Sequence, residues 1–201
     1  MADISSVRIA NMALSNVGAA STIESFDEAS TEAKQCKLWY DYSRLQALEA
    51  FDWSFARKRL VLAAHSDDPP EARWIYRYQY PADCVAARYI ENPLGVDADK
   101  VPYQVETSDD NGSKTILTNV SDAALVYTFD LQSPALFSAH FVETLSHLLA
   151  SHIAFTLTGK RTIKGDMIQT YRSLLRAAPA QNANEQSETK PREADWIRGR
   201  V

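Results

Sequence analysis

Cysteine is scarce in this sequence, which contains only Cys36 and Cys84, far apart and in different patterned segments. Neither belongs to a C-x-x-C pair, so the sequence indicates neither a zinc site nor redox chemistry. A free cysteine behaves as a small buried hydrophobic residue, and we expect both to pack in this way. A chain of 201 residues buries enough surface to fold without a disulfide or a metal, and we expect no cofactor.

Long apolar runs and an excess of positive charge are also missing. No uninterrupted apolar run approaches the roughly 18 residues of a membrane span, and the first residues lack the basic and apolar segments of a signal peptide. We therefore expect a protein that is made and kept in a cytosolic compartment, away from membranes. The net charge is −5, which excludes a chain-wide basic surface for nucleic acid but leaves local basic clusters possible.

The familiar catalytic motifs do not occur. The sequence has no G-x-S-x-G elbow, no G-x-x-x-x-G-K-[ST] loop and no G-x-G-x-x-G fingerprint. His140 and His147 fall on one helical stripe with Glu143 beside it, but zinc would need a third close ligand and the H-E-x-x-H pattern is absent. We interpret this stripe as a polar face at a solvent or subunit boundary, and we expect no enzymatic activity.

Helical patterns open the chain. Apolar residues at spacings of three and four predict a first helix over residues 5–17 and a second over 30–51, which begins with a serine N-cap. We expect Asp52 to cap a further helical turn that carries the basic cluster Arg57, Lys58 and Arg59.

The middle of the chain alternates as strands do. We expect strands over residues 74–80, 85–90, 103–107, 114–119 and 124–130. The pair Asn111-Gly112 predicts a hairpin between the third and the fourth, because both residues accept positive φ. In the first strand, alternation places Trp74, Tyr76 and Tyr78 on one face. That face forms either the core of the β domain or a surface for a neighbouring subunit.

Two more helices are expected after the strands. One opens with Pro134 at its first position and stops at Gly159, and the other covers residues 163–178. From Pro179 onward the chain is polar and is typical of an extended arm. The arm nevertheless ends in residues that are common in binding hot spots, Trp196, Ile197, Arg198 and Arg200.

This order of elements predicts an α+β fold. We expect the helices of residues 1–62 and 132–178 to pack together as a bundle, because their apolar faces need each other. An antiparallel β domain of residues 63–131 is inserted between them as a sheet or a small barrel. Residues 179–201 form an extended C-terminal arm.

Three stretches carry a resemblance to a known family. They are Ile9 to Gly18 with Ile23 and Phe26, then Trp53-Ser54-Phe55-Ala56 followed by Trp74 to Cys84, and finally Trp196-Ile197-Arg198. Together they resemble the tail tubular protein A family of short-tailed bacteriophages, the head-to-tail adaptors. The resemblance extends over nearly the whole chain, and its motifs consist of packing residues.

The resemblance implies a virion protein that forms a dodecameric ring beneath the portal protein, with the tail nozzle attached below. It implies that genomic DNA passes through the lumen of the ring without specific binding. A mildly acidic subunit suits such a conduit, because Lys and Arg contacts supply most non-specific affinity for DNA. Assembly is then expected in the host cytoplasm, and the final location is the virion tail at the portal vertex.

Candidate contact residues can be named for each partner. For the portal or a neighbouring subunit they are Trp196, Ile197, Arg198, Arg200, Arg57, Lys58 and Arg59. Because hairpin tips reach furthest from a rigid body, those for the nozzle are Asp109, Asp110, Asn111 and Gly112. Because aromatic residues are enriched at interfaces, those for the neighbouring subunit are Trp39, Tyr42, Trp74, Tyr76 and Tyr78. The alternatives are a basic cluster that is only a solvated helix end, and an arm that is loose or docks on its own bundle.

A peptidoglycan-degrading tail hydrolase is the alternative function, because phage tail parts must cross a cell wall. Glycan hydrolysis requires two carboxylates about 5–10 Å apart across a cleft. Candidate carboxylates are Asp27, Glu28, Asp52 and Glu143, but no spacing selects a pair.

Overall fold

The computed structural model describes residues 4–93, 95, 101–107 and 112–183. Its α-helices are α1 (Ser6–Asn16), α2 (Thr31–Ala50), α3 (Ala139–Thr158) and α4 (Arg161–Ala183). Its strands are β1 (Arg57–Val61), β2 (Tyr76–Gln79), β3 (Cys84–Ile90), β4 (Tyr103–Thr107), β5 (Lys114–Thr118) and β6 (Ala124–Phe129). Two short 3₁₀ turns are η1 (Ser54–Ala56) and η2 (Pro134–Leu136). The predicted α+β class is confirmed by these helices and by two antiparallel sheets of three strands each.

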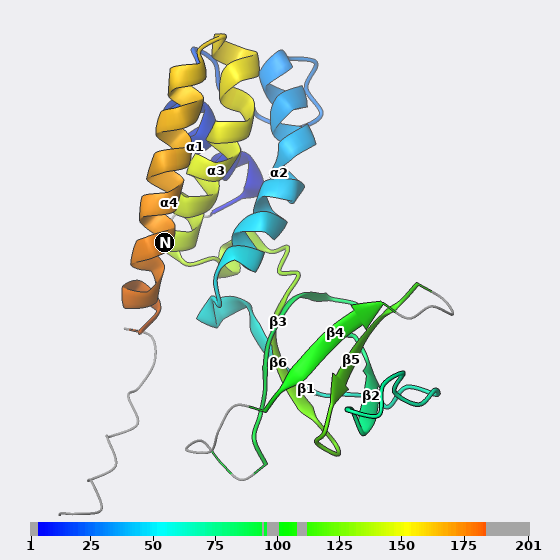
Figure 1. Cartoon of the computed structure of the whole chain (residues 1–201). Coiled ribbons are helices and arrows are strands. Elements are labelled where there is room, and N and C mark those ends of the chain that lie inside the picture. The colour runs from blue at the N-terminus through cyan, green and yellow to red at the C-terminus, as the bar shows by residue number, and fades with distance from the viewer. Residues whose placement is uncertain (1–3, 94, 96–100, 108–111, 184–201) are drawn as a thin grey trace, which may run out of the picture.

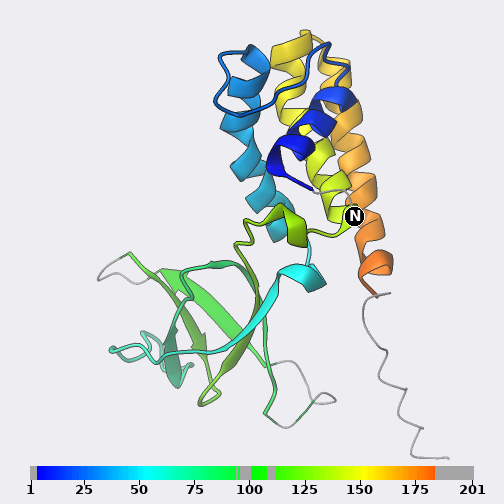
Figure 2. The ribbon, with the colours of Figure 1, turned by 180° about the vertical axis from the view of Figure 1, so that it is seen from behind.

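The four α-helices, which we call the helical part, pack around α3 (Figure 1). Helix α3 is buried along most of its length, and Phe141, Leu145, Leu149 and Ile153 form the centre of the core. Helices α2 and α4 flank α3 on opposite sides in both views, and α1 crosses it on the face that Figure 2 turns toward the viewer. The buried residues of α2 include Ala33, Cys36, Tyr40, Ala47 and Leu48, which form the side of this helix that faces the core.

Local signals set the ends of the helices. The Ser30 side chain accepts a hydrogen bond from the Ala33 amide at 3.2 Å, so this serine is the N-cap of α2 as predicted. Gly159 ends α3 with a φ of +69°, a left-handed conformation in which glycine lacks the steric penalty of other residues. The boundaries that the sequence predicts for these two ends are therefore confirmed.

The strands form the β part, at one end of the helical part (Figure 1). One sheet has the order β1-β6-β3 and the other β2-β5-β4. Isolated bridges link the sheets on both sides, Ala64 with Tyr78 and Ile90 with Val101. The six strands therefore close into a ring of pairings around a second core, which contains Ile116, Leu125 and Tyr127. The hairpin predicted around Asn111-Gly112 is present, since β4 and β5 pair antiparallel.

The basic cluster was placed wrongly by the sequence. Residues Arg57–Val61 form strand β1, and only Ser54–Ala56 form a short turn before it. The strand pairs with β6 from Arg57 opposite Thr128 to Val61 opposite Ala124, so the β part takes in residues that the predicted boundary at 62/63 assigned to the helices. The physical reason is that β6 presents unpaired backbone groups to this segment, and pairing satisfies them.

Two predicted helix boundaries also differ. Pro134 begins only the turn η2, and α3 starts at Ala139 with Ser138 as its N-cap. Phe137 between them is extended and packs on Phe55 and Phe141, which explains the interruption.

Helix α4 runs beyond Pro179, so residues 179–183 are helical where the sequence predicted an arm. Asn182 holds this last turn, because its Oδ1 accepts from the Ser54 amide at 2.9 Å. The predicted arm from residue 184 onward lies outside the described residues.

Candidate contact surfaces

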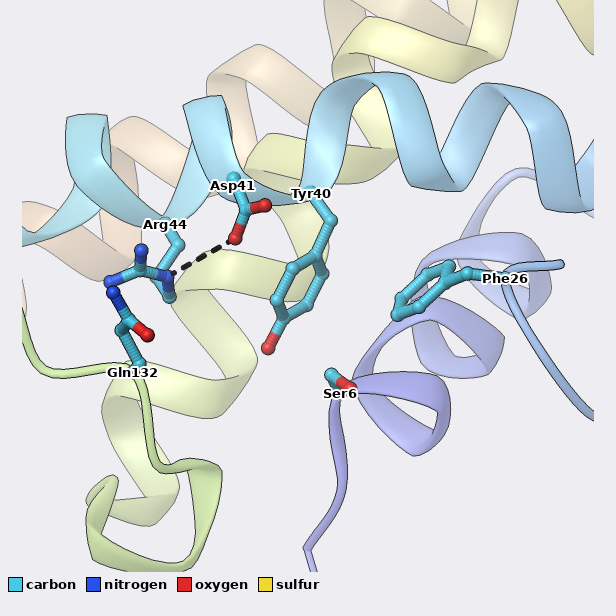
Figure 3. Close-up of a pocket in the computed structure, with 6 residues that line it drawn as sticks. All are labelled: Ser6, Phe26, Tyr40, Asp41, Arg44 and Gln132. Carbon is cyan, nitrogen blue, oxygen red and sulfur yellow. Dashed lines mark ion pairs between the residues drawn. The ribbon is translucent and has the colours of Figure 1, made fainter.

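A polar pocket of about 390 Å³ opens between the start of α1 and the middle of α2 (Figure 3). It is lined by Ser6, Phe26, Tyr40, Asp41, Arg44 and Gln132. The Tyr40 hydroxyl is buried and has no hydrogen-bond partner among the described residues. Burial raises the pKa of Tyr40 to about 12, so this hydroxyl stays protonated at neutral pH.

The cation in this pocket is already bound within the subunit. Arg44 is buried, forms an ion pair with Asp130, and donates to the Leu131 carbonyl at 2.9 Å. Its Nε lies 3.6 Å from the Asp41 carboxylate. Burial opposes ionisation of Asp130, but hydrogen bonds from Arg44 and Gln132 outweigh it and hold the pKa of Asp130 below its ordinary range. The pocket therefore has no uncompensated positive charge with which to hold an anion.

Trp39 and Tyr42 lie together on the outer side of the α2–α3 seam. The Trp39 ring stacks on His152 of α3 with centroids 4.6 Å apart, and Tyr42 meets both rings edge-on at 5.9 and 5.7 Å. Tyr42 is 56% exposed. The structure thus brings two of the predicted interface residues into one surface cluster, and it adds His152, which the sequence had not linked to them.

The three aromatic residues that the sequence places on one face of the first strand differ in their exposure. Trp74 and Tyr78 are only 5% and 4% exposed, and the Tyr78 hydroxyl donates to the Val120 carbonyl at 2.9 Å. These two residues pack inside the subunit and offer no surface to a neighbour. Tyr76 is 37% exposed, and its ring lies 6.2 Å from that of Tyr78. Of the three, Tyr76 alone remains available for an interface.

Each cation of the basic cluster has a carboxylate partner in the same chain. Arg57 pairs with Asp52 at 2.9 Å, Lys58 with Asp83 at 2.6 Å and Arg59 with Glu91 at 2.6 Å. The hydrogen bond from Lys58 lowers the pKa of Asp83. The cluster is neutralised locally, so it forms no concentrated positive patch for the portal. Asp52, the predicted helix cap, serves instead as the partner of Arg57.

Several predicted contact residues lie outside the described residues. For the nozzle they are Asp109, Asp110 and Asn111, and for the portal Trp196, Ile197, Arg198 and Arg200. Gly112 is described and has a φ of +67°, the positive value that the hairpin prediction required.

The predicted histidine stripe is partly buried. His140 Nε2 lies 2.9 Å from the Leu174 carbonyl, and His147 Nδ1 lies 3.0 Å from the Glu143 carbonyl, so both rings meet backbone groups. Across the described ranges, no three His, Cys, Asp or Glu side chains gather as metal ligands would.

The carboxylates considered for hydrolysis are separated. Asp27 pairs with Lys37 at 2.7 Å before α2, whereas Asp52 pairs with Arg57 beyond its other end. A general acid needs a raised pKa. The described carboxyl groups with shifted pKa values all move downward, and they are Asp27, Asp83 and Asp130.

Two further features were missed by the sequence analysis. Leu38 and Leu45 join Tyr42 as exposed apolar residues on α2, and their spacing of i, i+4 and i+7 was the signal that could have shown them. Arg88 of β3 donates to the carbonyls of Leu48 and Phe51 at 2.9 and 2.7 Å, which ties the β part to the end of α2. No local sequence pattern indicates this role of Arg88.

A scan against models of protein families finds no match to this chain, and a search of curated proteins finds none either. None of the described helices is long and apolar enough to span a membrane.

Proposed function

We propose that this protein is the head-to-tail adaptor of a short-tailed bacteriophage. Copies of it form a ring, dodecameric by resemblance, which docks under the portal protein, continues the DNA channel and provides the platform for the tail nozzle. The proposal rests on the resemblance carried by the chain's packing residues. In this proposal, the four helices form a bundle assembled from both ends of the chain, the β domain is inserted between them, and a C-terminal arm follows.

One structural observation supports this proposal most. The subunit is elongated, with the helical part at one end and the β part at the other (Figure 1). Arg44 and Arg88 join the two parts through contacts to Asp130, Leu48 and Phe51. A subunit with two differently built ends can contact a different partner at each of them, and an adaptor needs this property.

The hydrolase alternative has less support. A retaining or inverting glycosidase needs a pair of carboxylates across a cleft, and the candidate carboxylates with ion pairs, Asp27 and Asp52, are bound to Lys37 and Arg57. Clearance of a peptidoglycan suspension by the purified protein, abolished by Asp52→Asn or Glu143→Gln, would favour the hydrolase instead.

Imaging of the protein mixed with its portal tests the adaptor role directly. We expect a closed ring of copies on the portal axis, and deletion of residues 190–201 to weaken its docking. Wild-type protein that remains unbound beside the portal would contradict the adaptor role. Undiminished docking of the shortened chain would reject only the role of the arm.

A further inference from the structure

One face of α2 is apolar although it points away from the subunit core. Leu38, Tyr42 and Leu45 lie one above another at spacings of four and three, and they are 64%, 56% and 37% exposed. Glu49 continues the same line four residues further on. We call these four residues the α2 stripe. Apolar groups gathered on a surface mark an interaction site more often than scattered ones do.

The central residue of the α2 stripe is held in place from behind. The Tyr42 ring lies edge-on to Trp39 and His152, whose rings stack within 5° of parallel. A tyrosine fixed in this way loses little conformational freedom when a partner covers it, which favours it as an anchor.

The outer face of α4 is different in character. Spacings of four, three and four residues align a second line, the α4 stripe, which is Gly165, Gln169, Arg172 and Arg176. None of the ion pairs between described residues involves α4. A shallow hollow on this helix is lined by Asp166, Gln169, Thr170 and Ser173. The arginines of the α4 stripe thus have no ion-pair partner among the described residues, and the hollow beside Gln169 leaves room for an incoming side chain.

Opposite charges mark the two sides of the helical part. The segment from Glu24 to Glu49, which includes nearly all of α2, has six acidic and three basic residues, a formal charge of −3. The segment from Lys160, which directly precedes α4, to Arg176 has five basic residues and one acidic residue, a formal charge of +4. Helices α2 and α4 lie on opposite sides of α3 in both views (Figures 1 and 2). Complementary charge favours contact between unlike sides and opposes contact between like sides.

We propose that the α2 stripe of one copy docks on the α4 stripe of the next, with Tyr42 over the hollow and Glu49 facing the arginines of α4. Both helices run from the top to the bottom of Figure 1, so a rotation about an axis parallel to them brings α2 of one copy beside α4 of another without inverting either. Such a head-to-tail contact repeats, and it closes a ring when the rotation permits. The inference deepens the proposed function, on which it rests, by naming the two faces of the ring contact.

Two variants of the full-length chain test the contact. Leu38→Glu/Tyr42→Glu blocks the α2 stripe, and Arg172→Glu/Arg176→Glu blocks the α4 stripe. Sedimentation velocity is run on the wild type, on each variant alone and on their equimolar mixture. The matched control is Arg8→Glu/Met12→Glu, a change of exposed residues on α1. Circular dichroism shows that each variant remains folded.

We expect the wild type and the α1 control to associate beyond a dimer, and each blocked variant alone to be monomeric. In the mixture each chain retains one intact stripe of the opposite kind, so we expect a one-to-one dimer that grows no further. A monomeric wild type, a blocked variant that associates as the wild type does, or a mixture without the dimer would overturn this contact.

The same variants separate this inference from the adaptor role. Rings that persist on the portal with both blocked variants would remove the α2–α4 contact and leave the adaptor role intact. Wild-type rings that are disrupted by the blocked variants but never bind the portal would support the contact and oppose the adaptor role.

Discussion

Arg44 of α2 and Asp130, which directly follows β6, form an ion pair that fastens the helical part to the β part. The Arg44 side chain is 4% exposed, and it also donates to the backbone carbonyl of Leu131. A guanidinium buried to this degree needs its partners, because an unpaired buried charge strongly destabilises the folded state.

Asp130→Asn tests that ion pair. We expect the free energy of unfolding, measured with urea, to fall by about 2–3 kcal/mol, because Arg44 stays buried and loses a charged acceptor. Asp41→Asn is the matched control, since Asp41 faces the same guanidinium at 3.6 Å but is 81% exposed. It should change stability by less than about 0.5 kcal/mol. Equal losses in the two variants would contradict the structure.

Arg88 makes a second connection between the two parts. Its Nη2 donates to the carbonyls of Leu48, Glu49 and Phe51, and its Nε donates to the Thr128 hydroxyl at 2.8 Å. Arg88→Met should lower the free energy of unfolding by about 2–4 kcal/mol, because carbonyls at the end of α2 lose their donor. Arg59→Met, which removes a surface ion pair, should cost less than about 1 kcal/mol. Guanidinium unfolding curves of the two variants provide the comparison.

Alanine substitutions at Gly159 and Gly165 should change the free energy of unfolding in opposite directions. Gly159→Ala forces a side chain into left-handed backbone at the end of α3, and we expect a loss of about 1–2 kcal/mol. Gly165 is helical and has no atom within 4 Å of an added Cβ, so Gly165→Ala should stabilise the protein by about 0.5–1 kcal/mol. Thermal melting of dilute samples measures both changes. A gain at residue 159 would show that its backbone conformation differs.

Acidification should weaken the seam between α2 and α3 through His152. Burial and the nearby charge of Lys164 lower the pKa of His152 below its ordinary value of 6.5, so the unfolded chain takes up this proton first. The stability that neutral His152 contributes is complete above pH 6.5 and is lost as the pH falls from there toward the folded-state pKa of this residue. His152→Gln should flatten the pH dependence of the urea midpoint between about pH 7.5 and pH 5.5. An unchanged slope in this variant would exclude His152 as its source.

Local signals explain which elements the sequence could predict. Ser30 and Gly159 act through their own backbone, so their helix ends are visible without a structure. Strand β1 is different, because the segment Arg57–Val61 has little apolar alternation and becomes a strand through its pairing with β6. Pro179 signals a break, yet contacts of Asn182 with Ser54 and Asp52 continue α4 past it. Tertiary contacts determine both the formation of β1 and the continuation of α4, and such contacts cannot be read from a local sequence pattern.

In the candidate surfaces, too, local patterns were visible in the sequence and tertiary contacts were not. Aromatic alternation does not distinguish burial from exposure, and the structure buries Trp74 and Tyr78 but leaves Tyr76 37% exposed. The basic cluster lost its isolated positive charge because Asp83 and Glu91, distant in the sequence, lie beside Lys58 and Arg59. Trp39 and Tyr42 lie off the buried side of α2, and the structure leaves Tyr42 exposed and Trp39 half-buried.

The pairing of β1 with β6 also has a mechanical meaning. These are the strands by which the chain enters and leaves the β part, and Arg57 lies opposite Thr128 in their register. Two adjacent covalent connections alone would form a hinge, about which the β part could rotate relative to the helical part. Arg44 braces this junction at the exit connection, through the Leu131 carbonyl, and Arg88 braces it from the neighbouring strand β3, through the Leu48 carbonyl at the end of α2. We therefore expect the helical part and the β part to turn together as one body under an applied torque.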